Sequence, residues 1–125
     1  MNKYHTVKKN LEFAKIIGKG NLVKNKSFVI YFDMNDLNKY RFGISVSKKL
    51  GNAVYRNKYK RQLRSIIDKY KKNYQKNMDY IIIIRNGYIN LSFEEKEKDF
   101  LYLLNKINKF NNNLAKETSK NEEKE

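Results

Sequence analysis

The strongest candidate for a binding site in this sequence is the basic segment from Lys48 to Arg64. It reads KKLGNAVYRNKYKRQLR, and no aspartate or glutamate occurs between Leu37 and Ile67. Each arginine presents a planar fork of donors that matches the oxygen atoms of a phosphate group. Like charges four residues apart destabilise an isolated helix, so an external polyanion would offset this cost. The segment predicts a phosphate-binding surface, and the alternative is a solvated helix face without a ligand.

The protein itself offers little for covalent or hydrolytic catalysis. It contains one histidine, His5, and no cysteine. Its carboxylates have no spacing typical of a metal site, and no GxxxxGK[ST] or GxGxxG run is present. We expect that if a reaction is involved, another component supplies the catalytic groups.

Composition limits the class of protein further. The chain has 125 residues and a net charge of +15, while its hydrophobic content of 40% is enough for a core. The longest purely apolar run, Ile81–Ile84, is far too short to span a membrane. These features predict a cytoplasmic protein with one domain over residues 1–111 and a disordered polar tail over residues 112–125.

An amphipathic helix is expected to present the basic residues. Gly51 supplies a turn and Asn52 an N-cap at its start. At 3.6 residues per turn the helix has a continuous apolar stripe, made of Tyr55, Tyr59, Leu63, Ile66, Ile67, Tyr70 and Tyr74.

The remaining pattern predicts an α+β fold in which helices pack on one sheet. A basic arm over residues 1–9 precedes these elements. The expected elements are a helix over Asn10–Ile17, a short edge strand over Asn21–Val23, strands over Ser27–Phe32, Tyr40–Ser47 and Asp79–Arg85, and a last helix opened by a capping box of Ser92 and Glu95.

A second candidate surface lies on the sheet. Alternation along the strand over Tyr40–Ser47 turns the small residues Gly43, Ser45 and Ser47 to one face, beside Val29 and Tyr31. Such a trough suits a single nucleic-acid strand, whose bases stack and whose phosphates accept hydrogen bonds. The alternative is an ordinary core covered by the first helix. Phe13 on that helix fits either a core or a stacking role.

The basic segment resembles the "RNR" signature of the bacterial ribonuclease P protein subunit. Ser45-Val46-Ser47 before it, the first helix with Phe13 and the strands Phe28–Tyr31 and Asp79–Ile83 extend the resemblance over roughly residues 7 to 110. The resemblance implies a two-layer sandwich with the order α-β-β-β-α-β-α. It also implies a mixed four-stranded sheet in which the basic helix forms a left-handed crossover between parallel strands.

The same resemblance implies a function in tRNA processing. A catalytic RNA, holding Mg²⁺ ions, would act as the endonuclease that hydrolyses precursor tRNA, and the protein would be the non-catalytic subunit of this nuclease. No metal bound by the protein, no membrane and no obligate protein partner are expected. The residues implied to bind the catalytic RNA and nearby substrate are Lys48, Lys49, Gly51, Asn52, Arg56, Asn57, Lys60, Arg61 and Arg64.

The 5′ leader of precursor tRNA is implied to lie in a cleft between the first helix and the sheet. The residues concerned are Phe13, Ile17, Val29, Tyr31, Ser45 and Ser47. Ile17 departs from the family pattern, which commonly has an aromatic residue there, and an isoleucine does not stack on a base as an aromatic ring does.

The same residues leave three other functions as alternatives. A structural ribosomal protein would share the charge and the α+β layout. An RNA-cleaving enzyme acting alone is disfavoured because the acid–base groups are missing. Binding to a membrane surface through the basic helix is disfavoured because its apolar stripe is rich in tyrosine and needed for packing.

Overall fold

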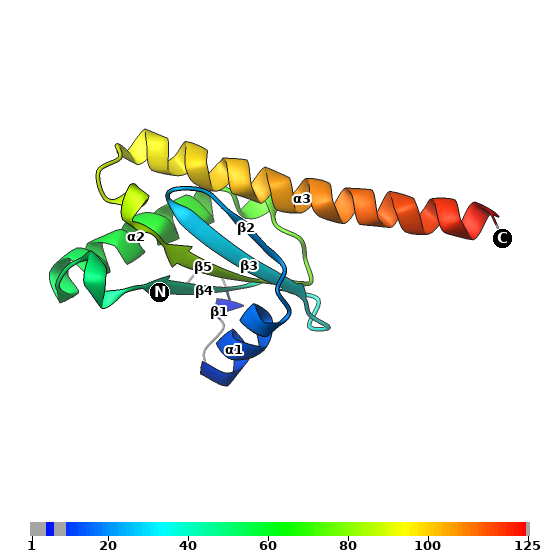
Figure 1. Cartoon of the computed structure of the whole chain (residues 1–125), viewed down its shortest axis with the longest axis horizontal. Helices are drawn as coiled ribbons and strands as arrows, with labels where there is room; N and C mark the ends of the chain where they lie inside the picture. The colour runs from blue at the N-terminus through cyan, green and yellow to red at the C-terminus, as the bar shows by residue number, and fades with distance from the viewer. Residues whose placement is uncertain (1–4, 7–9, 125) are drawn as a thin grey trace.

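The predicted order of helices and strands is confirmed. The computed structural model describes the backbone of residues 5–6 and 10–124 and the side chains of residues 13–110 (Figure 1). Its elements are β1 (His5–Thr6), α1 (Asn10–Gly18), β2 (Leu22–Lys24), β3 (Phe28–Met34), β4 (Arg41–Val46), η1 (Lys48–Leu50), α2 (Ala53–Lys69), η2 (Lys71–Asn73), β5 (Met78–Ile84), η3 (Asn86–Tyr88) and α3 (Phe93–Lys124).

The strands form one mixed sheet in the order β1-β4-β5-β3-β2. Strand β5 pairs in parallel with β4 and antiparallel with β3. Helix α2 therefore connects two neighbouring parallel strands, as expected, and the left-handed sense of this crossover stays a prediction. The two-residue strand β1 adds an edge to the four predicted strands. Residues 1–4 and 7–9 of the predicted basic arm lie outside the described residues.

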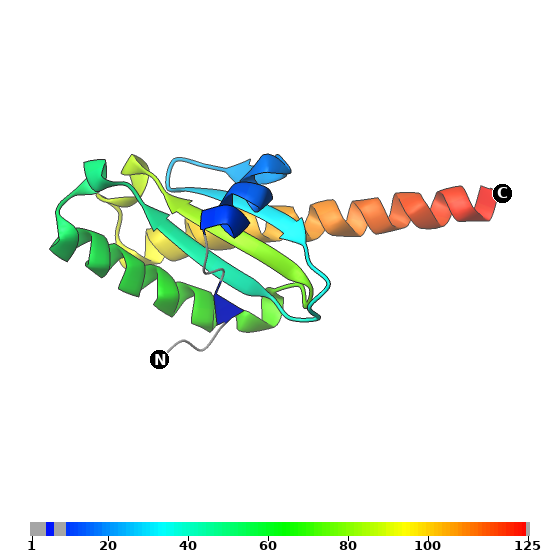
Figure 2. The same cartoon turned by 90° about the horizontal axis from the view of Figure 1, so that it is seen from below.

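The sheet separates two apolar clusters. Helices α2 and α3 cover one face, where alternate residues of β3, β4 and β5 meet them in the main core, including Phe28, Phe42, Tyr80, Leu63 and Leu103. This is the expected two-layer packing. Helix α1 lies on the opposite face (Figures 1 and 2), where Ile16 packs on Ile81.

The apolar stripe of α2 is confirmed from Tyr59 onward and is wrong at Tyr55. Tyr59, Leu63, Ile66 and Ile67 are buried, whereas Tyr55 is 54% exposed. Tyr55 belongs to the first turn of α2, and in Figure 2 the start of α2 extends past the end of the sheet.

Helix α3 begins with the predicted capping box. The Ser92 hydroxyl accepts from the Glu95 amide and the Glu95 carboxylate accepts from the Ser92 amide, both at 3.2 Å. The last buried residue of its apolar stripe is Ile107. The backbone stays helical to Lys124, through residues that the composition predicts to be a disordered tail. Lysine and glutamate are good helix formers. The domain boundary at residue 111 and the disordered tail after it both stay predictions.

Candidate nucleic-acid interface

The start of the basic helix is fixed by two side-chain caps. Ser47 caps η1, with its hydroxyl accepting from the Lys49 amide at 3.2 Å. Asn52 caps α2, with its carbonyl oxygen accepting from the Tyr55 amide at 3.2 Å. Between them Gly51 has a φ of +143°, a conformation that L side chains rarely adopt. The sequence S-K-K-L-G-N thus dictates a tight path from β4 into α2.

Helix α2 presents the predicted cations without partners. Val54, Asn57, Lys60, Arg61 and Arg64 line a hollow of about 510 Å³ on its outer surface. Within the part of the chain whose side chains are described, Lys48, Lys49, Lys60, Arg61 and Arg64 form no ion pair or side-chain hydrogen bond. Uncompensated cations at this density attract a polyanion.

Arg56 differs from the other cations because one of its nitrogen atoms is buried without a partner in the described part of the chain. Its Nε is enclosed and has no hydrogen-bond acceptor among the described residues. A buried donor without an acceptor is unfavourable, by about 1–3 kcal/mol for a neutral group. Because Nε is enclosed, a phosphate oxygen could bond to it only after the Arg56 side chain moves, so the unsatisfied donor favours a rearrangement of Arg56 when an anion binds.

The second predicted surface lies on the other face of the sheet, under α1. In the strand register Val29, Ile83 and Ser45 form one row, and Tyr31, Ile81 and Gly43 form the next. Val29, Tyr31, Ser45 and Ile83 are half-buried. This face therefore offers both aromatic and hydroxyl groups at a partly open surface.

Phe13 meets this sheet face at Gly43, with Cζ and Cε1 of its ring nearest to the glycine. A Cβ placed on Gly43 would be 2.4 Å from Cζ of Phe13 and 2.9 Å from Cδ1 of Ile81. Phe13 is half-buried beside the Ile16–Ile81 cluster. The sequence left a core and a stacking role open for Phe13, and the geometry gives it one face in the core and leaves part of the ring accessible.

The structure brings together some of the predicted leader residues and separates others. Phe13, Val29, Tyr31 and Ser45 share the α1 face of the sheet, and Ile17, which is 36% exposed, lies on the same side of α1 as Phe13. Ser47 lies beyond the end of β4, where it caps η1. It marks the junction between the sheet surface and the basic helix.

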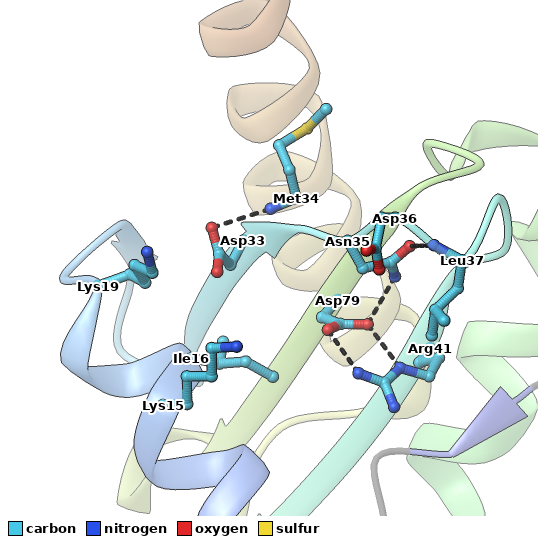
Figure 3. A pocket seen from close by; sticks show the side chains of 10 residues that line it. All are labelled: Lys15, Ile16, Lys19, Asp33, Met34, Asn35, Asp36, Leu37, Arg41 and Asp79. Atoms are coloured by element: carbon cyan, nitrogen blue, oxygen red, sulfur yellow. Dashed lines mark hydrogen bonds and ion pairs between the residues drawn. The ribbon is translucent and has the colours of Figure 1, made fainter.

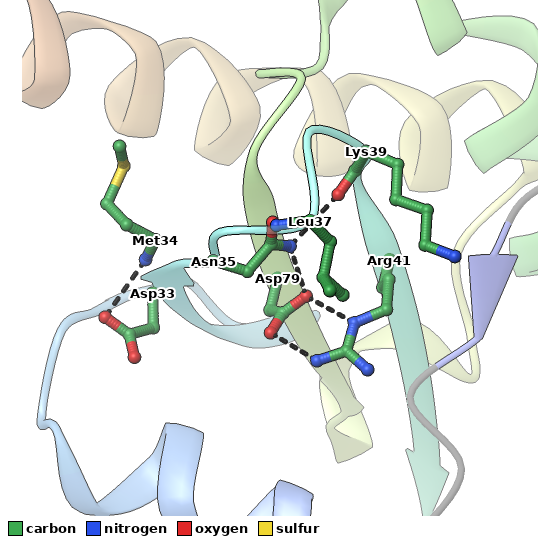
Figure 4. A network of polar contacts seen from close by, with 7 residues as sticks. All are labelled: Asp33, Met34, Asn35, Leu37, Lys39, Arg41 and Asp79. Atoms are coloured by element: carbon green, nitrogen blue, oxygen red, sulfur yellow. Dashed lines mark hydrogen bonds and ion pairs between the residues drawn. The ribbon is translucent and has the colours of Figure 1, made fainter.

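A polar cluster at the other end of β4 was missed by sequence reasoning. Asp79 is 4% exposed and accepts hydrogen bonds from Nε and a terminal nitrogen of Arg41, both at 2.8 Å (Figure 4). Asn35 donates to the same carboxylate at 2.8 Å and also to the carbonyl of Lys39. The signal was present, because an aspartate that opens a buried strand must be paired.

Next to this cluster is a polar hollow of about 520 Å³ (Figure 3). Lys15 and Lys19 form its α1 wall, and Asp33, Asp36 and Leu37 belong to the opposite wall. Lys15 lies on the side of α1 away from Phe13 and Ile17, because it is two residues from each at about 100° per residue, and Lys19 follows directly after the end of the helix. Helix α1 therefore separates this hollow from the predicted leader surface.

A buried lysine ties the basic helix to α3. Lys96 is 5% exposed, donates to the Gln62 side chain at 3.1 Å and lies 4.3 Å from the ring centroid of Tyr88. Burial, and then the nearby charge of Lys58, lower the pKa of Lys96. The Tyr88 hydroxyl donates to the same Gln62 oxygen at 2.9 Å, and burial raises the pKa of Tyr88. These contacts help to fix the position of α2 relative to α3.

Two further observations concern the described residues as a group. Among them no three histidine, cysteine, aspartate or glutamate side chains gather in a way that could hold a metal ion. No helix in the described part of the chain has both the length and the apolar character needed to cross a membrane.

The fold and these surfaces define a class of small, strongly basic α+β proteins in which a cationic helix joins two parallel strands. The family model described as Ribonuclease P matches residues 1–108. The chain belongs to this ribonuclease P protein family.

Known relatives agree in sequence and in fold. The ribonuclease P protein component of Streptococcus pneumoniae is 41% identical over 120 residues, which cover 94% of this chain and 98% of the relative. That of Mesoplasma florum is 47% identical over 102 residues, covering 81% and 89%. Among solved structures, the RNase P protein of Staphylococcus aureus matches with a TM-score of 0.75 and 38% identity over 82% of this chain and 94% of that one. The protein from Thermotoga maritima gives 0.73 and 30% over 80% and 94%.

Proposed function

We propose that this protein is the RNA-binding subunit of ribonuclease P and assists a catalytic RNA in removing the 5′ leader of precursor tRNA. The chemistry and the Mg²⁺ ions belong to the RNA. The protein binds the catalytic RNA through η1 and α2 and the leader on the α1 face of the sheet. Its family and its relatives' names support the role in tRNA processing.

One observation carries the division into two RNA-binding surfaces. Strand β4 contributes Gly43 and Ser45 to the sheet surface and then leads through Ser47 and Asn52 directly into the basic helix. A strand of RNA lying along β4 would therefore end beside the cations of α2. Substrate and catalytic RNA would meet at this junction.

The physical contribution of the protein is alignment and charge neutralisation. Two RNA molecules that approach each other repel through their phosphates, and unpaired cations such as Arg56, Arg61 and Arg64 reduce that repulsion. Holding the leader converts a loose end into an oriented one and so lowers the entropy cost of reaching the cleavage geometry.

Reconstituted cleavage tests this function. A precursor tRNA is incubated at physiological salt and magnesium with a bacterial ribonuclease P RNA, with and without the protein, and with the protein alone. We expect efficient leader removal only when both components are present. Cleavage by the protein alone would favour a self-sufficient nuclease. RNA binding without any stimulation would favour a structural ribosomal protein.

A further inference from the structure

Tyr55 is an exposed aromatic residue whose position the packing of the protein does not explain. Its side chain is 54% exposed, whereas Tyr59, one turn later, is buried. Within the described part of the chain, the Tyr55 ring makes no aromatic or cation–π pair and its hydroxyl has no hydrogen-bond partner. An exposed aromatic ring that stabilises nothing inside the protein is a candidate for contact with a partner.

The Tyr55 side chain lies next to Gly51. A Cβ on Gly51 would lie 3.1 Å from Cβ of Tyr55 and 3.6 Å from its Cγ. The φ of +143° at Gly51 is itself open mainly to glycine. Because Gly51 has no Cβ, the turn before α2 leaves room beside Cβ and Cγ of Tyr55, which a larger residue at position 51 would crowd.

The charges around Tyr55 indicate that its partner is negatively charged. Lys48 and Lys49 precede it in η1, Lys58 follows one turn later on the same side of α2, and no acidic residue occurs between Leu37 and Ile67. An acid-free cationic setting around an exposed ring fits a nucleic acid, whose bases stack while its phosphates meet the lysines.

Tyr55 does not share the face of the cations that line the outer hollow. It precedes Arg64 by nine residues, which is about two and a half turns at 3.6 residues per turn, so the two side chains point to opposite sides of α2. A partner that contacts both Tyr55 and Arg64 must therefore bind the start of α2 on two opposite sides. Val54, which is 73% exposed, lines the outer hollow on the Arg64 side.

We propose that Tyr55 is a stacking platform for an unpaired base of the catalytic RNA, so that the RNA grips both flanks of α2. This inference rests on the proposed function and adds a residue that recognises a base to residues that bind phosphates. Stacking tolerates any base, so Tyr55 positions the RNA without reading its sequence.

Tryptophan fluorescence tests the contact directly, because the chain contains no tryptophan. Tyr55→Trp introduces a single reporter, and Tyr102→Trp is a matched control because Tyr102 is 55% exposed on α3. Titration with ribonuclease P RNA should quench the emission of Tyr55→Trp strongly and leave that of Tyr102→Trp little changed. Equal signals in both variants, while the RNA binds, would overturn the proposal.

Binding measurements provide the second test. Tyr55→Ala should weaken the affinity for the catalytic RNA about 10-fold, Tyr55→Phe should retain it, and Tyr102→Ala should leave it unchanged. The slope of affinity against salt should stay the same in Tyr55→Ala, because no phosphate contact is lost. A reduced slope would assign Tyr55 to phosphate rather than base contact and would overturn the proposal.

Different results would contradict the proposed function and the stacking role of Tyr55. If the wild-type protein does not bind ribonuclease P RNA, the proposed function is wrong and the stacking proposal falls with it. If the wild type binds with its full salt dependence and Tyr55→Ala binds equally well, the stacking proposal alone is wrong. Because Tyr55 and Tyr102 both lie outside the core, thermal unfolding of all five variants should match the wild type.

Discussion

Phe13 and Gly43 are in direct contact across the interface of α1 and the sheet. The Cζ atom of Phe13 occupies the space that a side chain at position 43 would need, since an added Cβ would be 2.4 Å away. The contact sets how closely α1 approaches β4. It therefore determines the geometry of the surface on which the leader is proposed to lie.

Gly43→Ala should displace Phe13 and loosen α1 from the sheet. Overpacking of this kind typically costs about 1–3 kcal/mol of stability, and we expect a loss of that size in chemical denaturation. Gly18→Ala is the matched control, because a Cβ there meets nothing within 4 Å. Equal stabilities of the two variants would show that Phe13 yields without cost and that the contact does not fix α1.

Arg56 and Arg61 should each contribute one phosphate contact. Replacing either by alanine is expected to weaken binding to the catalytic RNA and to reduce the slope of log K against log salt by about one unit. Lys109→Ala, which removes an exposed cation from α3, should leave the slope unchanged. An unaltered slope in both arginine variants would contradict the assignment of α2 to phosphates.

The free protein should lose stability at alkaline pH through Tyr80. Burial raises the pKa of Tyr80 to about 12, from 10.0 in the unfolded chain. The folded state thus retains a proton that the unfolded state releases, so this contribution is fully present below pH 10 and is lost as the pH rises through about 12.

The shift corresponds to roughly 3 kcal/mol, because each pKa unit is worth about 1.4 kcal/mol. Tyr80→Phe should therefore lose less stability than the wild type between pH 9 and pH 12, measured as the free energy of unfolding at each pH. Parallel curves for the two proteins would mean that the Tyr80 phenol ionises normally in the folded state.

Much of the architecture could be predicted from the sequence because hydrophobic periodicity is a local signal. Phe28, Ile30 and Phe32 alternate into the core, and the Ser92–Glu95 capping box opens α3 where its residue types indicate. Tyr55 shows where this reasoning fails. Periodicity gives the side of the helix on which a residue lies, but not whether the sheet extends beneath it.

The polar clusters could not be derived because they depend on strand register and helix packing. Arg41 and Asp79 are 38 residues apart in sequence, and they meet because β4 and β5 are parallel and in register at these positions. Lys96 and Gln62 meet because α2 and α3 share one face of the sheet. The local pattern indicates that Asp79, in a buried strand, needs a partner, but it does not indicate which residue that partner is.

If the protein has two separate RNA-binding surfaces, Tyr31→Ala should affect one of them and spare the other. Tyr31 is half-buried on the α1 face, opposite the face that α2 covers. Tyr40→Ala is a control at a half-buried tyrosine that packs on the core of that other face. Stability is checked first for both variants. Affinity is then measured for the catalytic RNA alone and, in the holoenzyme, for precursor tRNA with and without its leader.

We predict that Tyr31→Ala loses roughly 1–3 kcal/mol of affinity for precursor tRNA, the range for base–aromatic stacking. The loss should vanish when the leader is removed, and binding to the catalytic RNA should match that of the wild type and of Tyr40→Ala. A parallel loss of affinity for the catalytic RNA, or a loss that persists without the leader, would contradict the two-surface account.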